Sequence, residues 1–297
     1  MRVIDVINRA VSSLPYDAQE SKAIAVRVLI NLANLKSYTH LVEPNLELPE
    51  DIANKIEQII QELEQGRPIQ YTLGFEEFYN LKFNVKEGVL IPRPETEELV
   101  RLIINDYSKS EEKSLNILDI CTGSGCIAWS LAYGLNSKIE SIFGCDISPA
   151  ALEIANSQLS EQEEGKLVTN KPQLFLCDIL APTALDTLQK SCYNKLDIIV
   201  SNPPYVCNSE KELMRNNVLN YEPHIALFVP DKEPLIFYSK IAQLGKSLLK
   251  SGGKLYFEIN ERYGEEIKKM IEDFGYCNTL IIKDFNNKDR VVVGVIK

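Results

Sequence analysis

The sequence has few of the residues on which hydrolases and zinc enzymes depend. It contains only two histidines, His40 and His224, and its seven cysteines include no CxxC pair. This scarcity gives no support to a catalytic triad or a zinc site, and an odd, scattered set of cysteines predicts no disulfide framework. We therefore expect a reducing, cytoplasmic environment. No apolar run reaches ~18 residues, and Asp5 and Arg9 interrupt the N-terminal segment, so neither a membrane span nor a signal peptide is expected.

The chain also has fewer positively charged than negatively charged residues. The chain has 32 Lys and Arg against 42 Asp and Glu, which gives a net charge of -10. This balance opposes the attraction to phosphates that nucleic-acid-binding proteins use, so we expect no direct nucleic-acid partner. With 45% hydrophobic and 25% charged residues over 297 positions, the composition is typical of a globular protein of two domains.

Helical periodicity marks the first part of the chain. Asp17 and Glu20 have the spacing of a capping box, and Pro49–Gly66 bounds a helix with one apolar stripe. Residues Phe75–Leu90 change character and predict a short β-ribbon or an extended bridge. We expect three segments: a helical domain over residues 1–74, a ribbon or linker over 75–94, and a further domain over 95–297.

Strands and helices alternate in the last of these segments. Such alternation predicts an α/β fold with a mostly parallel, doubly wound, Rossmann-like sheet. Two β-rich runs near the C-terminus predict a hairpin and hence an antiparallel final strand. The expected strands are Ile117–Ile120, Ser141–Cys145, Leu174–Leu176, Leu196–Val200, Lys254–Ile259, Thr279–Phe285 and Arg290–Ile296.

A glycine-rich run follows the first of these strands. Gly123, Gly125 and Ala128 match the pattern G-x-G-x-x-G/A, and Asp146 lies 21 residues after Gly125 at the end of the next strand. Glycines permit a sharp turn close to a ligand, and an acidic residue at this distance can accept hydrogen bonds from ribose hydroxyls. The pattern indicates an adenosine-containing cofactor. A nicotinamide dehydrogenase would show the same features, and a tight turn without a ligand is the structural alternative.

The segment Asn202-Pro203-Pro204-Tyr205 follows the strand Leu196–Val200. In open α/β sheets, ligands bind at the carboxyl ends of the strands. Two prolines fix the backbone and leave carbonyls without local amide partners, so the Asn202 side-chain oxygen and a proline carbonyl can face one NH2 group as two acceptors.

Two such acceptors suit methyl transfer to a planar amide nitrogen. They would orient the nitrogen lone pair and stabilise the positive charge that develops on it, while Tyr205 could stack on the planar group. The exocyclic amine of adenine in DNA presents the same delocalised NH2, so N6-methylation of adenine is an alternative. The structural alternative is a proline pair that only ends a strand.

Several separated motifs together resemble the HemK/PrmC-type family, the release factor glutamine methyltransferases, which are protein-(glutamine-N5) methyltransferases. The resemblance covers nearly the whole chain. Besides the glycine turn and Asn202–Tyr205, it is carried by the segments Gly66–Tyr71, Leu90–Glu97, Tyr221–Pro223 and Lys288–Arg290.

The resemblance implies that S-adenosyl-L-methionine is the methyl donor and that the substrate is the glutamine in the Gly-Gly-Gln loop of a peptide chain release factor, docked in part by the helical domain. It implies that Asn202, Pro203, Pro204 and Tyr205 hold the glutamine. It also implies a set of cofactor-binding residues, namely Cys121, Thr122, Gly123, Ser124, Gly125, Asp146 and Asn202, with Asp178 and Ile179 contacting the adenine.

One departure from the family pattern bears on the substrate. Cys121 stands where release-factor enzymes usually have glycine, and the run Cys121–Cys126 also resembles a sister family that methylates a glutamine of a ribosomal protein. That protein substrate stays an alternative, as does a non-catalytic module that binds a translation factor. Glu222 and His224 could flank the target pocket, but a loop glutamate and an isolated histidine are more often solvated or core groups, so neither is assigned a role. The acidic cluster Glu161, Glu163 and Glu164 is interpreted as a solvated loop.

Overall fold

The computed structural model describes residues 1–110, 114–158 and 168–297, so the acidic cluster at Glu161, Glu163 and Glu164 lies outside the described residues. The chain divides into two compact units. One comprises residues 1–75 with 214–221, and the other comprises residues 76–213 with 222–297. Within the described ranges, no helix has both the length and the apolar character needed to cross a membrane.

The first unit is helical. Asp17 caps its second helix, because one carboxylate oxygen accepts the backbone N–H groups of Gln19 and Glu20 at 2.9 Å each, which confirms the predicted helix start. Apolar side chains of the longer helices form a separate core, which includes Val6, Leu29 and Ile60. The helices are α1 (Val3–Ser13), α2 (Ala18–Ala33), α3 (Thr39–Val42), α4 (Glu50–Glu64), α5 (Ile69–Leu73) and α10 (Asn216–Tyr221).

Residues 214–221 group with these helices although they come much later in the chain. The Arg215 guanidinium lies 2.7 Å from the Glu20 carboxylate, and the Tyr221 hydroxyl donates to the Gln65 carbonyl at 3.2 Å. Neither periodicity nor composition indicates this grouping in the sequence, because the pairs that hold it are 195 and 156 residues apart.

A two-stranded ribbon precedes the large sheet. Strands β1 (Phe75–Phe78) and β2 (Leu81–Asn84) pair with each other. The two residues between them, Tyr79 and Asn80, both have positive φ, at 50° and 56°, as a tight type I′ hairpin requires. The rings of Phe78 and Phe83 pack edge to face with centroids 5.9 Å apart, so the ribbon contributes buried apolar area to the second unit.

The second unit is built on a seven-stranded sheet with the order β10-β11-β9-β6-β3-β4-β5. Neighbouring strands from β9 to β5 pair in parallel, and β11 is antiparallel to both of its neighbours. This confirms the predicted fold class. The strands are β3 (Leu115–Ile120), β4 (Ile139–Asp146), β5 (Gln173–Leu176), β6 (Leu196–Ser201), β9 (Leu249–Glu258), β10 (Tyr276–Lys283) and β11 (Asp289–Ile296).

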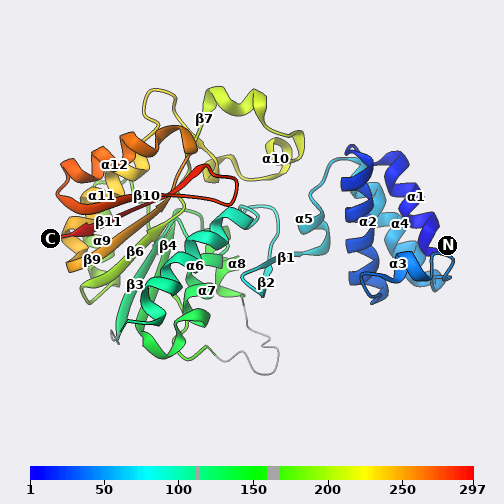
Figure 1. The fold of residues 1–297 in the computed structure, drawn as a ribbon, viewed down its shortest axis with the longest axis horizontal. Helices are drawn as coiled ribbons and strands as arrows, with labels where there is room; N and C mark the ends of the chain where they lie inside the picture. Colours follow the sequence, from blue (N-terminus) through cyan, green and yellow to red (C-terminus); the bar gives the residue numbers. More distant parts are fainter. Residues whose placement is uncertain (111–113, 159–167) are drawn as a thin grey trace. The chain divides into compact units, whose positions relative to one another are not determined.

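Helices cover both faces of this sheet (Figure 1). On β3, Ile117 packs into the cluster that contains α6 and α7, and Leu118 packs into the cluster that contains α9, α11 and α12. Burial on both faces explains why these strands are continuous apolar runs. The helices are α6 (Pro94–Ser108), α7 (Cys126–Gly134), α8 (Pro149–Asn156), α9 (Ala184–Ser191), α11 (Ile236–Leu248) and α12 (Gly264–Asp273).

The chain order reverses at β3, which lies between β4 and β6. Ligands in doubly wound sheets bind outside the carboxyl ends of the strands at such a switch point. The glycine run follows β3, Asp146 ends β4 and Asn202 follows β6, so the fold brings the predicted motifs to one edge. Short elements complete the unit: β7 (Val206–Cys207), β8 (Phe228–Val229), and the 3-10 turns Asn136–Lys138, Asn208–Leu213, His224–Ala226 and Glu261–Tyr263.

Candidate active site

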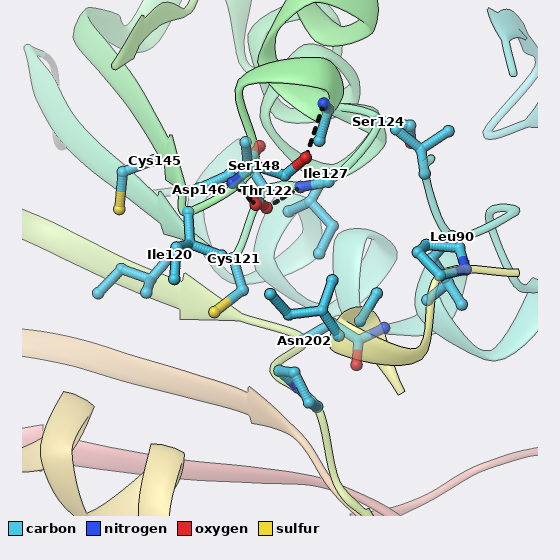
Figure 2. Close-up of a pocket in the computed structure, with 18 of the residues that line it drawn as sticks. Leu90, Ile120, Cys121, Thr122, Ser124, Ile127, Cys145, Asp146, Ser148 and Asn202 are labelled. Atoms are coloured by element: carbon cyan, nitrogen blue, oxygen red, sulfur yellow. Dashed lines mark hydrogen bonds between the residues drawn. The ribbon is translucent and has the colours of Figure 1, made fainter. Parts of the chain in front are cut away.

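A cavity of about 320 Å³ opens at the carboxyl ends of these strands, within the range of small-ligand sites (Figure 2). Most residues predicted for the site line it, whereas Gly125, Pro203 and Tyr205 are not among its lining residues. The predicted residues that do line it are Cys121, Thr122, Gly123, Ser124, Asp146, Asp178, Ile179, Asn202 and Pro204.

The turn after β3 is left-handed at three positions. Cys121, Gly123 and Gly125 have φ angles of 61°, 54° and 79°. A β-carbon on Gly123 would meet no atom within 4 Å, whereas one on Gly125 would lie 3.0 Å from Ala155 Cβ. Gly123 therefore keeps the cavity wall open, and Gly125 allows close helix packing. Because an L-residue is strained at positive φ, the backbone itself explains why glycine is usual at the position of Cys121.

Asp146 holds this turn from the end of β4. Its carboxylate accepts the backbone N–H of Gly123 and that of Ser148, each at 2.9 Å, as the dashed lines in Figure 2 show. Burial raises the pKa of Asp146, and these backbone hydrogen bonds oppose the shift. Each carboxylate oxygen has a further lone pair, so Asp146 can accept ligand hydroxyls while it holds the turn. This arrangement fits the ribose of an adenosine cofactor.

A second carboxylate lies beneath the turn. Asp119 is fully buried and accepts the Thr122 hydroxyl at 2.5 Å and the Ala128 N–H at 3.2 Å through the same oxygen. Its other oxygen, Oδ1, has no hydrogen-bond partner in the described part of the chain. Burial raises the pKa of Asp119 to about 7. Asp119 was given no role from the sequence, and its contacts tie the glycine turn to the start of α7.

The side of the cavity at Asn202 depends on side chains. Asn202 Nδ2 donates to Thr96 Oγ1 at 3.1 Å, and the Thr96 hydroxyl in turn donates to Glu258 Oε2 at 2.6 Å. The Tyr205 hydroxyl donates to the other oxygen of Glu258 at 3.2 Å. We call these four side chains the Asn202–Glu258 network. It joins β6 and its following loop to the first turn of α6 and to the end of β9.

Thr96 and Glu258 are the residues of this network that the sequence analysis missed. Both are buried, with 2% and 1% of their surface exposed. A signal for Glu258 was present, because a glutamate in an otherwise apolar buried strand requires polar partners. Thr96 lies within the segment Leu90–Glu97 that carries the family resemblance, but it was assigned no role of its own, since threonine in the first turn of a helix is ordinary.

Glu222 also has a position that its sequence context did not predict. Its side chain is 1% exposed, lies 2.6 Å from the Arg93 guanidinium, and accepts the Ile91 N–H at 3.1 Å. This pair holds the segment before α6 to the loop after residue 221, and both segments line the cavity. His224, by contrast, is exposed, and its ring packs edge to face with Phe228.

The chain is similar along nearly its whole length to two curated bacterial proteins, each named release factor glutamine methyltransferase. It is 41% identical over 278 residues to that of Bacteroides thetaiotaomicron, with 93% of each chain covered. It is 41% identical over 280 residues to that of Flavobacterium psychrophilum, with 93% of this chain and 92% of the relative covered. The chain belongs to the release factor glutamine methyltransferase family. It is therefore an S-adenosylmethionine-dependent methyltransferase.

Two further comparisons cover only part of this chain. A solved structure from Streptococcus mutans, described as a SAM-dependent methyltransferase, matches with a TM-score of 0.50 and 14% identity, covering 74% of this chain and 55% of that one, which supports the fold. Residues 140–290 match the family described as Eco57I restriction-modification methylase. That match includes the segment Asn202–Tyr205 and leaves out the glycine turn.

Proposed function

We propose that this chain transfers the methyl group of S-adenosyl-L-methionine to the side-chain nitrogen N5 of the glutamine in the Gly-Gly-Gln loop of peptide chain release factors. The observation that carries the proposal is that Asp146 and Asn202 line the same cavity. The first is suited to a ribose and the second to an NH2 group. The names of the relatives support a release factor as the substrate.

The cofactor half of the cavity comprises the glycine turn, Asp146 and the segment after β5. Asp146 would accept the ribose hydroxyls, and the bare Cα of Gly123 would allow close approach of the ligand. Asp178 and Ile179, which line the cavity where β5 ends, would contact the adenine. The bound cofactor supplies an electrophilic methyl group.

The target half would bind the glutamine amide through two acceptors, Asn202 Oδ1 and a carbonyl of the proline pair that follows it, of which Pro204 lines the cavity. Holding both amide hydrogens directs the nitrogen lone pair toward the methyl group and stabilises the charge that develops on nitrogen. The amide nitrogen held by these acceptors would take the methyl group of the cofactor, whose sulfonium sulfur would become a thioether, and the proton that the nitrogen then loses would pass to water. Because the proton leaves only after the methyl transfer, no side chain of the site has to act as a general base. Tyr205, held by Glu258, would pack against the planar amide.

The helical unit would dock the release factor. Residues 1–75 have their own apolar core and form a compact unit with residues 214–221, so this part of the chain is a separate body that would serve to recognise the protein substrate. Since release factors act in translation termination, the proposed reaction takes place in the cytoplasm.

A single assay tests the proposal. Purified enzyme is incubated with methyl-labelled S-adenosylmethionine and, in parallel, with a release factor, the same factor carrying Gln→Ala in its Gly-Gly-Gln loop, total ribosomal protein, and duplex DNA. We expect label on the release factor and none on its variant. Label on a ribosomal protein alone would mean that the proposed reaction is correct but that its substrate is a ribosomal protein.

Methylation of adenine N6 in DNA is the second candidate, and the match of residues 140–290 favours it. The net charge of -10 argues against DNA as the substrate, because a DNA methyltransferase must bind the negatively charged phosphate backbone. Turnover on duplex DNA with none on protein would decide for this candidate.

A further inference from the structure

The orientation of one amide group decides which substrate the target half can accept. An asparagine side chain ends in one acceptor oxygen and one donor nitrogen of nearly equal size, and a 180° rotation exchanges them. With the oxygen toward the cavity, Asn202 suits an NH2 group. With the nitrogen toward the cavity, it would suit a carboxylate, which only accepts hydrogen bonds.

Thr96 removes this ambiguity. Its hydroxyl has a single hydrogen, which is directed to Glu258 Oε2 at 2.6 Å. Only a lone pair of Thr96 Oγ1 remains for Asn202 at 3.1 Å, and a lone pair can bond the amide nitrogen but not the amide oxygen. The direction of the Thr96 hydroxyl therefore fixes Asn202.

Glu258 sets the direction of that hydroxyl. An ionised carboxylate can only accept, and Glu258 accepts from Thr96 on one oxygen and from Tyr205 on the other. Burial raises the pKa of Glu258 and the nearby Glu95 adds to this shift, whereas the Thr96 and Tyr205 hydrogen bonds and the positive charge of Arg290 oppose it. The two hydroxyl donors and the guanidinium thus favour the charged form that imposes this polarity.

The remaining atom of Asn202 is available to a ligand. No hydrogen bond to Asn202 Oδ1 occurs within the part of the chain that the structure describes, and Asn202 lines the cavity. We propose that Thr96 and Glu258 are positioning residues that hold the Asn202 oxygen toward the cavity and thereby make the enzyme selective for a glutamine amide over a glutamate carboxylate. This inference rests on the proposed function and adds the origin of its specificity.

The test compares Thr96→Val, which keeps the branched shape and removes the hydroxyl, with Thr96→Ser, which keeps the hydroxyl. Binding of a release factor and of its Gly-Gly-Glu loop variant is measured at pH 7.5 in the presence of S-adenosylhomocysteine, together with turnover of the Gln form. In the valine variant the Asn202 nitrogen loses its partner, so the flipped orientation becomes favourable. We expect kcat to fall roughly 10- to 100-fold and the Gln-over-Glu binding preference to fall about tenfold or more, with KM for the cofactor unchanged.

The serine variant should restore both quantities to within about threefold of the wild type. Thr96→Ala serves in place of the valine variant if that protein does not fold, with the same expectation. Thr187→Val is the matched control, because it makes the same substitution in helix α9, where the Thr187 hydroxyl donates to the Thr183 carbonyl and the residue does not line the cavity, and it should leave turnover and the Gln-over-Glu preference unchanged.

The outcomes separate the two proposals. If the wild-type enzyme labels the release factor but the valine or alanine variant keeps its Gln-over-Glu preference, this inference alone is overturned. Thr96 would then be a packing residue. A wild-type enzyme that labels no release factor overturns the proposed function. A preference that collapses in the valine variant and returns in the serine variant supports the inference.

Discussion

The two halves of the cavity are held together by different kinds of interaction. In the cofactor half, Asp146 accepts backbone N–H groups of residues 23 and 2 positions away, and the turn takes its shape from residues with positive φ. In the target half, Asn202 is joined through Thr96 to Glu258 by side chains that are 106 and 162 positions apart.

This difference separates residues that bind the cofactor from residues that orient the target amide. Backbone amides and glycines produce a rigid cradle whose shape does not depend on the direction of any side-chain hydrogen. A chain of hydroxyl, amide and carboxylate groups has a direction, and it can present either an acceptor or a donor to the ligand. We therefore expect changes in the cofactor half to alter affinity and changes in the target half to alter turnover and selectivity.

The largest expected effect is that of Asn202→Ala. Loss of the amide oxygen removes an acceptor whose interaction strengthens as charge develops on the target nitrogen, so kcat should fall by at least roughly 100- to 1,000-fold. Affinity for S-adenosylmethionine, measured by calorimetry, should change little. A parallel loss of cofactor affinity would show that the two halves are not separable in the way proposed.

Asp146→Ala tests the opposite half. Removal of the carboxylate takes away both the proposed ribose contacts and the acceptor of the Gly123 N–H, so the Kd for S-adenosylmethionine should rise roughly 10- to 100-fold. At saturating cofactor, kcat should stay within a few-fold of the wild type. Calorimetry and steady-state rates with the release factor measure the two quantities, and an unchanged Kd would contradict the assigned role.

The same contrast explains what could be predicted from the sequence. The strands, the glycine turn and Asp146 could be predicted, because apolar periodicity and short spacings record local structure. The contacts of Thr96 with Glu258 and the Arg93–Glu222 pair could not, since they join residues 129 to 162 positions apart. The glutamate in the apolar strand β9 indicated only that Glu258 needs polar partners, and not which residues supply them. The grouping of residues 214–221 with the helical unit depends on contacts between residues 156 and 195 positions apart.

Within the cofactor half, Gly123 and Gly125 differ in role: Gly123 faces the cavity, and Gly125 packs against Ala155 and Trp129. Gly123→Ala meets no atom within 4 Å, so it should cost about 1–2 kcal/mol of folding stability from the positive φ alone. Gly125→Ala adds contacts at 3.0 Å to Ala155 and 3.1 Å to Trp129, and should lower the free energy of unfolding by about 1 kcal/mol more. Chemical denaturation of both variants measures the difference, and equal losses would contradict the packing role of Gly125.

The smallest expected effect concerns Asp119, which supports the turn from below. Its pKa in the folded protein is raised by burial to about 7, from an ordinary value of 3.8. A carboxyl group with a raised pKa contributes stability that is fully present below about pH 4 and is lost as the pH rises through 7. Between pH 6 and pH 8 the wild type should lose about 1 kcal/mol from this group.

Asp119→Asn has no such titration, so the comparison isolates the effect. The Tm of the variant minus that of the wild type, measured without ligand, should increase from pH 6 to pH 8, whatever constant offset the substitution introduces. Titrations shared by both proteins cancel in this difference. A difference that stays flat across this range would mean that Asp119 is already ionised at pH 6, and the turn would then rest on a buried charge instead of a neutral carboxyl group.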